Sequence, residues 1–244
     1  MRKLELCLRK EEIDEDELLG KVAVVFDIFL ATSTAAAMLH NGAKEVIPVL
    51  NYEDALQKAK EQAAQDHVLV GEYLGRTIEG FLFPFPTRLK ERVNGKTVVF
   101  STTNGTVALR KTRSAKAVFA ASMLNEGPLT NYLIDTYRDE SIVLVCSGSN
   151  GKFSLEDFFG AGSFIKTLTD AGLKEGLEWR MSDASLAALH FYQANVENAE
   201  ELLQQSRVGK SLVEEGFRDE LVFTLQKNAC PVIPHLDGDT LKPV

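Results

Sequence analysis

The sequence predicts an α/β fold, a three-layer α/β/α sandwich around a mostly parallel or mixed sheet. Short apolar, β-branched runs alternate with helical patterns along the chain. Several of these runs are apolar throughout, as expected for central strands covered on both faces. The 244 residues, of which 45% are hydrophobic, supply enough material for a large core. We therefore assign residues 1–244 to a single domain and leave open whether it contains two similar halves.

The strands are expected wherever apolar residues run together or alternate with polar ones. Residues 3–8 alternate in this way, so the N-terminal segment indicates a strand rather than a signal peptide. The expected strands are residues 3–8, 21–29, 45–50, 67–70, 97–100, 116–121, 141–146 and 232–235, and the residues beyond are expected to be loop.

Helices are expected where the apolar residues recur with helical spacing. The expected helices are residues 35–41, 52–65, 105–111, 124–138, 154–171 and, with breaks near Asn195 and Gly216, residues 182–227. Ser154 and Asp157 resemble a capping box at the start of one of them. The stretch from Gly71 to Lys90 contains Pro84 and Pro86, so we expect it to be irregular and functional.

Two parts of the chain resemble each other. Val24-Val25-Phe26 and Val98-Val99-Phe100 are each followed by hydroxyl residues, a helix and a further strand. An old duplication and two merely similar βαβ units both explain this echo.

Composition narrows the possible partners and the compartment. A net charge of −8 and a pI near 5.2 disfavour binding to nucleic acid, since the chain shows no basic patch. No apolar run is long enough to cross a membrane. The three scattered cysteines favour reduced thiols, so the expected location is cytoplasmic.

Three expected strands end in loops rich in hydroxyl groups and glycine. Carboxyl ends of parallel strands share one edge of a sheet, and helix N-termini there favour anions. The sequence therefore predicts a site for a small anionic phosphate ester. The alternative is that each loop only caps its own helix. The candidate substrate-binding residues are Thr32, Ser33, Thr34, Ser101, Thr102, Thr103, Asn104, Gly105, Thr106, Ser147, Gly148 and Gly151.

Acidic side chains fall beside the same loops. Carboxylates next to a phosphate would repel it unless a cation stood between them, and Mg²⁺ suits that role. We assign Asp27, Glu72 and Asp157 as catalytic residues that bind Mg²⁺ or orient the attacking water. Glu156 is a further acidic candidate, and the capping box already accounts for Asp157.

Several known phosphate-binding and phosphatase motifs are missing from the sequence. There is no Gly-x-x-x-x-Gly-Lys-Ser/Thr loop and no Gly-x-Gly-x-x-Gly after a strand. No second Asp follows Asp27 two residues later, and no Cys-x₅-Arg loop follows Cys146. The remaining chemistry is a metal-assisted attack by water.

The motifs together resemble one known family, the 2-phosphosulfolactate phosphatases (ComB). They are residues 26–34, 41–43, 71–72, 101–106, 146–148 and 153–157, in family order over about residues 3 to 236. The resemblance implies a ComB-like three-layer fold and a Mg²⁺-dependent phosphatase. Such an enzyme converts 2-phospho-3-sulfolactate to 3-sulfolactate and phosphate.

Two positions depart from the family pattern. Leu30 stands where the family usually has Arg, and Leu82–Pro86 is apolar where the family loop is polar. Arg76, Arg88 and Lys152 are candidates to replace the missing cation. Two alternatives follow, a phosphatase for a less charged ester and a non-catalytic homologue that binds a phospho-ligand. The apolar segment also leaves two roles open, a homodimer interface and a lid over substrate.

Overall fold

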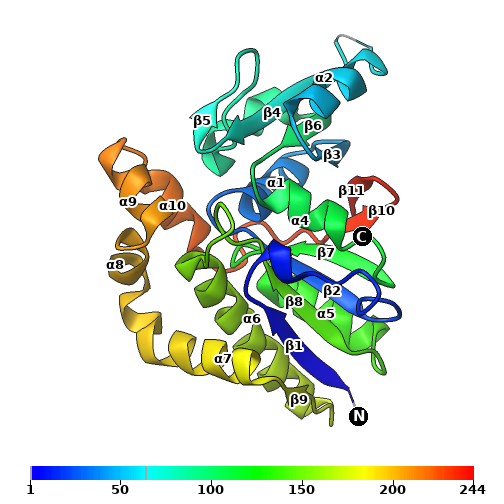
Figure 1. Ribbon diagram of the computed structural model, residues 1–244, viewed down its shortest axis with the longest axis vertical. Helices are drawn as coiled ribbons and strands as arrows, with labels where there is room; N and C mark the ends of the chain where they lie inside the picture. The colour runs from blue at the N-terminus through cyan, green and yellow to red at the C-terminus, as the bar shows by residue number, and fades with distance from the viewer. Residues whose placement is uncertain (1, 64) are drawn as a thin grey trace.

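The computed structural model describes residues 2–63 and 65–244, and it confirms the three-layer α/β fold (Figure 1). The strands are β1 Lys3–Cys7, β2 Val22–Phe26, β3 Glu45–Val49, β4 His67–Tyr73, β5 Arg76–Thr77, β6 Thr97–Ser101, β7 Ala117–Ala121, β8 Ile142–Cys146, β9 Arg180–Met181, β10 Pro234–Asp237 and β11 Thr240–Pro243. The helices are α1 Ala31–His40, α2 Tyr52–Lys60, α3 Lys90–Val93, α4 Gly105–Lys111, α5 Glu126–Thr136, α6 Leu155–Lys174, α7 Asp183–Asn195, α8 Ala199–Gln204, α9 Arg207–Glu214 and α10 Arg218–Thr224. Short 3₁₀ turns are η1 Lys10–Glu12, η2 Pro86–Arg88 and η3 Val196–Asn198.

The sheet consists of two parallel groups of strands joined by an antiparallel hairpin. Its order is β5-β4-β6-β3-β11-β10-β7-β2-β8-β1-β9. Strand β11 pairs with β3 through Leu241 and Val46, and β10 pairs with β7 through His235 and Phe119. The expectation of loop beyond residue 235 was wrong, because Gly238, with φ of 59°, allows a two-residue turn that folds β11 back onto β10.

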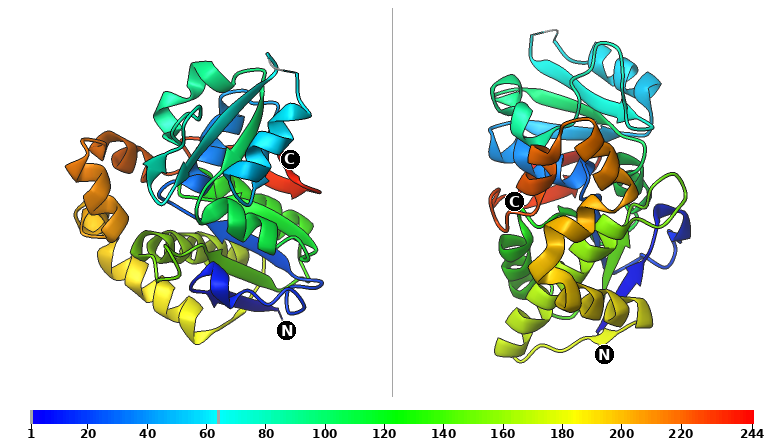
Figure 2. Two further views of the ribbon diagram at one scale, coloured as in Figure 1. Left: turned by 45° about the horizontal axis from the view of Figure 1, so that its top comes forward. Right: turned by 90° about the vertical axis from the view of Figure 1, so that its left-hand side faces the viewer.

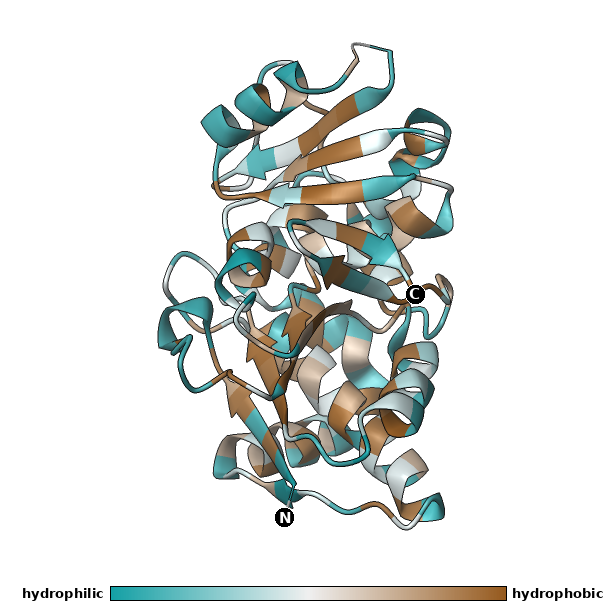
Figure 3. Ribbon diagram, turned by 90° about the vertical axis from the view of Figure 1, so that its right-hand side faces the viewer, coloured by the Kyte–Doolittle hydropathy of each residue, from teal (hydrophilic) through white to brown (hydrophobic). Residues whose placement is uncertain are grey.

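Alternate residues of β2 face two different cores, which explains the apolar run. Val22, Val24 and Phe26 pack in the cluster that contains Phe164 of α6, and the Phe26 and Phe164 ring centroids are 5.6 Å apart. Ala23 and Val25 point the opposite way and join residues of α1 and α4. The neighbouring strands β7 and β8 are buried along their whole length as well, and strands in the lower half of Figure 3 are coloured as hydrophobic over most of their length.

The two stretches that echo each other cross between the parallel groups in opposite directions. The unit β2-α1-β3 leaves the β7-β2-β8-β1 group for the β4-β6-β3 group, and β6-α4-β7 returns. Their helices begin side by side, because a Cβ on Gly105 of α4 would lie 2.4 Å from the Cβ of Ala31 of α1. The carboxyl ends of β2 and β6 therefore meet at a switch point of the topology, where open α/β sheets bind ligands.

Three local expectations differ from the structure. Helix α1 begins at Ala31, so the hydroxyl residues expected in the preceding loop form its first turn. Strand β4 continues through Glu72 to Tyr73 and turns back through Leu74 and Gly75, both at positive φ, into β5. Helix α2 ends at Lys60, and the expected helix over residues 52–65 includes residue 64, which lies outside the described residues.

Helices α8–α10 form an arm beside the sheet (Figures 1 and 2). This arm follows α7 along one side of the molecule and returns toward the loop after β5. Thr87 and Arg88 of η2 donate hydrogen bonds to the buried carboxylate of Glu220 in α10. None of the helices in the described part of the chain is long and apolar enough to cross a bilayer.

Candidate active site

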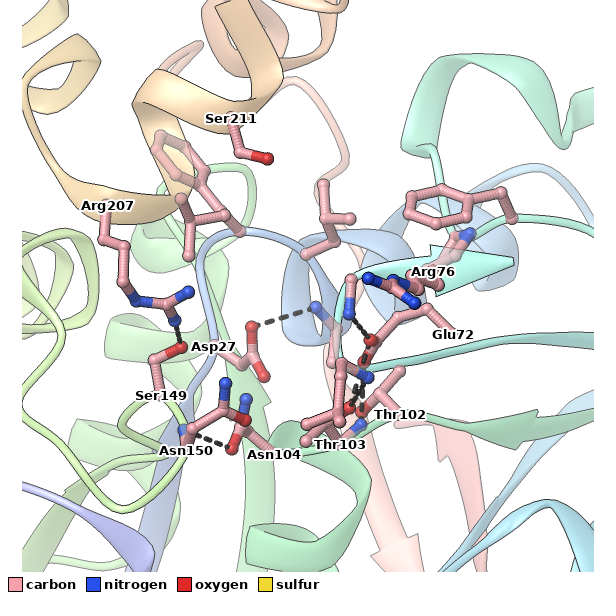
Figure 4. A pocket seen from close by; sticks show the side chains of 18 of the residues that line it. Asp27, Glu72, Arg76, Thr102, Thr103, Asn104, Ser149, Asn150, Arg207 and Ser211 are labelled. Carbon is pink, nitrogen blue, oxygen red and sulfur yellow. Dashed lines mark hydrogen bonds between the residues drawn. The ribbon is translucent and has the colours of Figure 1, made fainter. Parts of the chain in front are cut away.

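A cavity of about 300 Å³ opens where the strands of both parallel groups end (Figure 4). The turn after β2, the β4–β5 hairpin, the loop after β6, the loop after β8 and helix α9 supply its walls. Its lining residues are Asp27, Phe29, Leu30, Ala31, Glu72, Leu74, Gly75, Arg76, Phe83, Pro84, Thr102, Thr103, Asn104, Ser149, Asn150, Arg207, Val208, Ser211 and Glu215.

Asp27 lies at the centre of this cavity. It follows β2 directly, and its Oδ1 accepts a hydrogen bond of 3.2 Å from the Ala31 backbone N–H. Thr32 fixes the Asp27 backbone, because its Oγ1 accepts from the Asp27 N–H and donates to the Asp27 carbonyl. Burial raises the pKa of Asp27 to about 7, and the carboxylates of Glu72 and Glu156 add to this rise. Burial thus favours the neutral form of Asp27, and a cation bound beside it would favour the charged form.

Glu72 enters the cavity from the β4–β5 hairpin. Its Oε1 accepts a hydrogen bond of 2.7 Å from the Thr103 backbone N–H, and its Oε2 accepts from Thr103 Oγ1 and from the Gly75 N–H. These bonds hold the carboxylate between the hairpin and the loop after β6. Oε1 keeps a lone pair for a metal ion or for water, whereas Oε2 already accepts two hydrogen bonds.

The hydroxyl residues after β6 largely satisfy one another. The N–H of Thr102 donates to Thr106 Oγ1, and the N–H of Thr106 donates to Thr102 Oγ1. Thr106 is fully buried, whereas Thr102 and Thr103 line the cavity. The Thr102 hydroxyl donates a long hydrogen bond of 3.4 Å to that of Thr106. The loop thus contains hydroxyl groups that bond to one another and hydroxyl groups that line the cavity.

Asn104 connects three segments at the floor of the cavity. Its Oδ1 accepts a hydrogen bond of 2.7 Å from the Lys10 ammonium and one of 3.2 Å from the Asn150 backbone N–H. The Lys10 side chain is mostly buried there, so its charge lies close to the loop after β6. No local motif marks Lys10, which is 94 residues from Asn104 in the chain.

The other expected substrate-binding residues lie away from the cavity wall. Thr34 donates a hydrogen bond of 2.6 Å to the Pro84 carbonyl, and Ser33 and Thr34 are buried in α1. Ser101 lines a different cavity behind Thr103. Gly105 lies against Asp27 with no room for a side chain.

The loop after β8 reaches the cavity through the two residues that lie between the expected Gly148 and Gly151. Ser149 and Asn150 line it, whereas Ser147, Gly148 and Gly151 are not among the lining residues. Gly148 adopts a φ of 69°, and a Cβ at this position would lie 2.8 Å from the Cβ of Arg9, so the turn requires glycine.

Asp157 has a structural position. Ser154 caps α6 by accepting from the Asp157 N–H, as the capping-box pattern predicted. The Asp157 carboxylate accepts a hydrogen bond of 3.0 Å from the Ile28 backbone N–H and another of 3.1 Å from the Gly148 backbone N–H. It is buried and does not line the cavity, so it joins the β2 and β8 loops.

Two arginines face the cavity from opposite walls (Figure 4). Arg76 lies beside Glu72, and Arg207 of α9 bonds to the hydroxyl of Ser149. The sequence analysis named Arg76, but Arg207 lies in an arm without any local motif. Of the other cations it named, Arg88 pairs with Glu220 and Asp219, and Lys152 does not line the cavity.

An apolar wall completes the cavity. Phe29, Leu30, Phe83 and Pro84 form it, so part of the segment expected as interface or lid lies over the site. Phe85 packs on Phe217 of the arm at 4.3 Å between ring centroids. This wall limits the access of water to the polar floor.

The donor set at Asp27 and Glu72 suits Mg²⁺. Mg²⁺ is commonly held by one or two carboxylates together with substrate phosphate and water. Across residues 2–63 and 65–244, no group of three or more His, Cys, Asp or Glu side chains could bind a metal ion. The two carboxylates fit a site that the phosphate of a substrate completes.

The raised pKa of Asp27 leads to a prediction about stability without metal. The folded protein holds a proton on Asp27 up to about pH 7, whereas the unfolded chain releases it near pH 4. The folded state thus binds more protons in this window, and the free energy of unfolding falls as the pH rises through it.

In EDTA, we expect the melting temperature to fall by several degrees between about pH 5 and about pH 8. Asp27→Asn should reduce this fall, and the two melting temperatures should differ most at about pH 8. An unchanged pH dependence in the variant would contradict the assignment.

Known proteins resemble this chain over most of its length. Residues 7–239 match the family described as 2-phosphosulpholactate phosphatase. Three relatives are named "Probable 2-phosphosulfolactate phosphatase". The protein from Thermotoga maritima is 37% identical over 88% of this chain and 89% of its own. The protein from Clostridium perfringens strain SM101 is 35% identical over 99% of this chain and 96% of its own. The protein from Clostridium beijerinckii is 34% identical over 97% of this chain and 98% of its own.

Proposed function

The chain belongs to the 2-phosphosulfolactate phosphatase family, and we propose that it converts 2-phospho-3-sulfolactate and water to 3-sulfolactate and phosphate with the help of Mg²⁺. Members of this family are phosphoric monoester hydrolases. The single observation that carries the proposal is the meeting of Asp27 and Glu72, from opposite parallel groups of the sheet, in one cavity with Arg76 and Thr102.

Asp27 and Glu72 would hold the ion. Bound there, Mg²⁺ would supply positive charge to the phosphoryl oxygens as the phosphate is transferred to water. The sequence analysis also included Asp157 among the ligands. We leave it out because both of its oxygens accept backbone hydrogen bonds outside the cavity.

The other groups bind and orient the substrate. The Thr102 hydroxyl and the Arg76 guanidinium contact phosphate oxygens, and the second oxygen of Asp27 orients the attacking water. A new bond forms between the water oxygen and phosphorus, and the bond from phosphorus to the C2 ester oxygen breaks. The attacking water releases one proton and the leaving C2 oxygen takes one up as the hydroxyl of 3-sulfolactate, so that ester and water together give 3-sulfolactate and phosphate.

A phosphate-release assay tests the proposal. We expect release from 2-phosphosulfolactate with Mg²⁺ to fall at least about tenfold in EDTA and to return when Mg²⁺ is restored. A panel of small phosphate monoesters serves as the comparison. Release from another ester alone would overturn the substrate, and release that EDTA leaves unchanged would overturn the metal. The absence of release from every ester would favour a non-catalytic homologue that binds a phospho-ligand.

A further inference from the structure

The cavity contains a cation that the proposed chemistry at phosphorus does not use. Arg207 is the first residue of α9, and its guanidinium reaches the wall opposite Glu72 and Arg76 (Figure 4). Asp27 lies between these two walls in the same view. A ligand whose phosphate lies near Glu72 would therefore extend its other end toward Arg207.

The position of Arg207 is well defined despite its place in the arm. Ser206 caps α9, because its Oγ accepts a hydrogen bond of 3.0 Å from the Gly209 N–H. Gly209 is required there, since a Cβ would lie 1.9 Å from the Leu203 carbonyl oxygen. The Arg207 side chain then bonds to Ser149 Oγ in the loop after β8. The guanidinium is thus directed into the cavity by two segments.

The charge of Arg207 remains available to a ligand. Ser149 is a neutral partner, so the hydrogen bond orients the guanidinium without neutralising it. The carboxylate of Glu156 lines a smaller cavity together with Arg207, and burial raises the pKa of this carboxyl, which favours its neutral form. A guanidinium has five N–H donors in a planar fork, so it can keep Ser149 and still bind a carboxylate or a sulfonate through two others.

We propose that Arg207 binds an acid group of the substrate other than its phosphate, either the sulfonate or the carboxylate. This inference rests on the proposed function, because it takes 2-phosphosulfolactate as the substrate. The other polar residues of this wall are the neutral Ser149, Asn150 and Ser211 and the acidic Glu215, so Arg207 is the cation that this wall presents among the lining residues. Arg207 therefore determines whether a charged or an uncharged ester is preferred.

Three esters separate the groups that Arg207 could bind. 2-Phosphosulfolactate carries phosphate, carboxylate and sulfonate, 2-phospholactate lacks the sulfonate, and isopropyl phosphate carries phosphate alone. We expect Arg207→Ala to lower kcat/KM for 2-phosphosulfolactate by about 30-fold. For isopropyl phosphate the change should stay within about threefold. The kcat/KM of Arg207→Lys for 2-phosphosulfolactate should lie between those of the unmodified protein and Arg207→Ala, because an ammonium keeps the charge but loses the planar set of N–H donors.

The outcome with 2-phospholactate identifies the bound group. A loss confined to 2-phosphosulfolactate would assign the sulfonate, and an equal loss on both acids would assign the carboxylate. Equal losses on all three esters, or no loss on any, would overturn the proposal. The control is Lys210→Ala, which removes an exposed positive charge from the same helix outside the cavity.

Binding of the product tests Arg207 independently of turnover. We expect calorimetry to show 3-sulfolactate binding about 30-fold more weakly to Arg207→Ala than to the unmodified protein. If the unmodified protein hydrolyses none of the esters but this difference holds, the proposed function fails and the assignment of Arg207 stands. If both proteins bind 3-sulfolactate equally, or neither binds it, the assignment of Arg207 fails.

Discussion

Asp27→Asn should lower kcat for 2-phosphosulfolactate by about 10³-fold, the largest effect expected of any single substitution in this chain. The variant keeps the shape of the side chain and its acceptor for the Ala31 N–H. It loses the negative charge that would hold Mg²⁺ and orient water. Because the carboxylate is buried and its pKa is raised, its loss should cost no stability near neutral pH. Steady-state phosphate release and thermal melting measure the two quantities separately.

Asp157→Asn provides the matched control. The Asp157 carboxylate accepts from two backbone N–H groups, and an amide would direct its own N–H at one of them. Because Asp157 lies outside the cavity, we expect folded Asp157→Asn to keep most of the original kcat, whereas Asp27→Asn does not. An Asp27→Asn protein that keeps more than about a tenth of the original kcat would contradict the central role of Asp27.

Gly105→Ala should lower kcat by about 100-fold without touching a group that reacts. The added Cβ would lie 2.7 Å from Asp27 Oδ2 and 2.9 Å from Asp27 Cβ, so the carboxylate must move. Displacement of a catalytic group by about 1 Å is enough for a loss of this size. The kinetic parameters of the purified variant, measured with saturating Mg²⁺, check this expectation.

Ala31→Gly separates displacement of Asp27 from a clash between helices. The new Cβ would also lie 2.4 Å from that of Ala31, and Ala31→Gly removes this contact alone. We expect Ala31→Gly by itself to keep most of the activity. We expect the double variant to remain impaired, because both contacts with Asp27 persist. Full recovery in the double variant would show that packing between α1 and α4, rather than the position of Asp27, limits turnover.

The layers of the fold and the acidic pair were accessible from local sequence patterns. The apolar runs predicted the central strands, and α4 has the bounds that its pattern predicted. Asp27 was identified because it lies near the end of an apolar strand, and Glu72 because it follows the expected strand over residues 67–70. Both patterns depend on neighbouring residues, and both residues line the cavity.

What the sequence did not reveal depends on contacts between distant residues. Arg207 reaches the cavity because the arm is held by Glu220, whose partner Thr87 is 133 residues away. The role of Thr32 was also hidden, since its pattern suits anion binding as well as the bond it makes to the Asp27 backbone. A hydroxyl in sequence does not indicate whether its partner is the protein or a ligand.

The hairpin of β10 and β11 has a consequence for how the chain acquires its shape. It is the last pair of strands in the sequence, yet it lies between β3 and β7 in the middle of the sheet. During synthesis, both parallel groups are made before the strands that join them. The helices that cross between the groups must bring them together first, and the hairpin then completes the sheet. Refolding should therefore be slow for a chain of this size, because its final pairings span long loops.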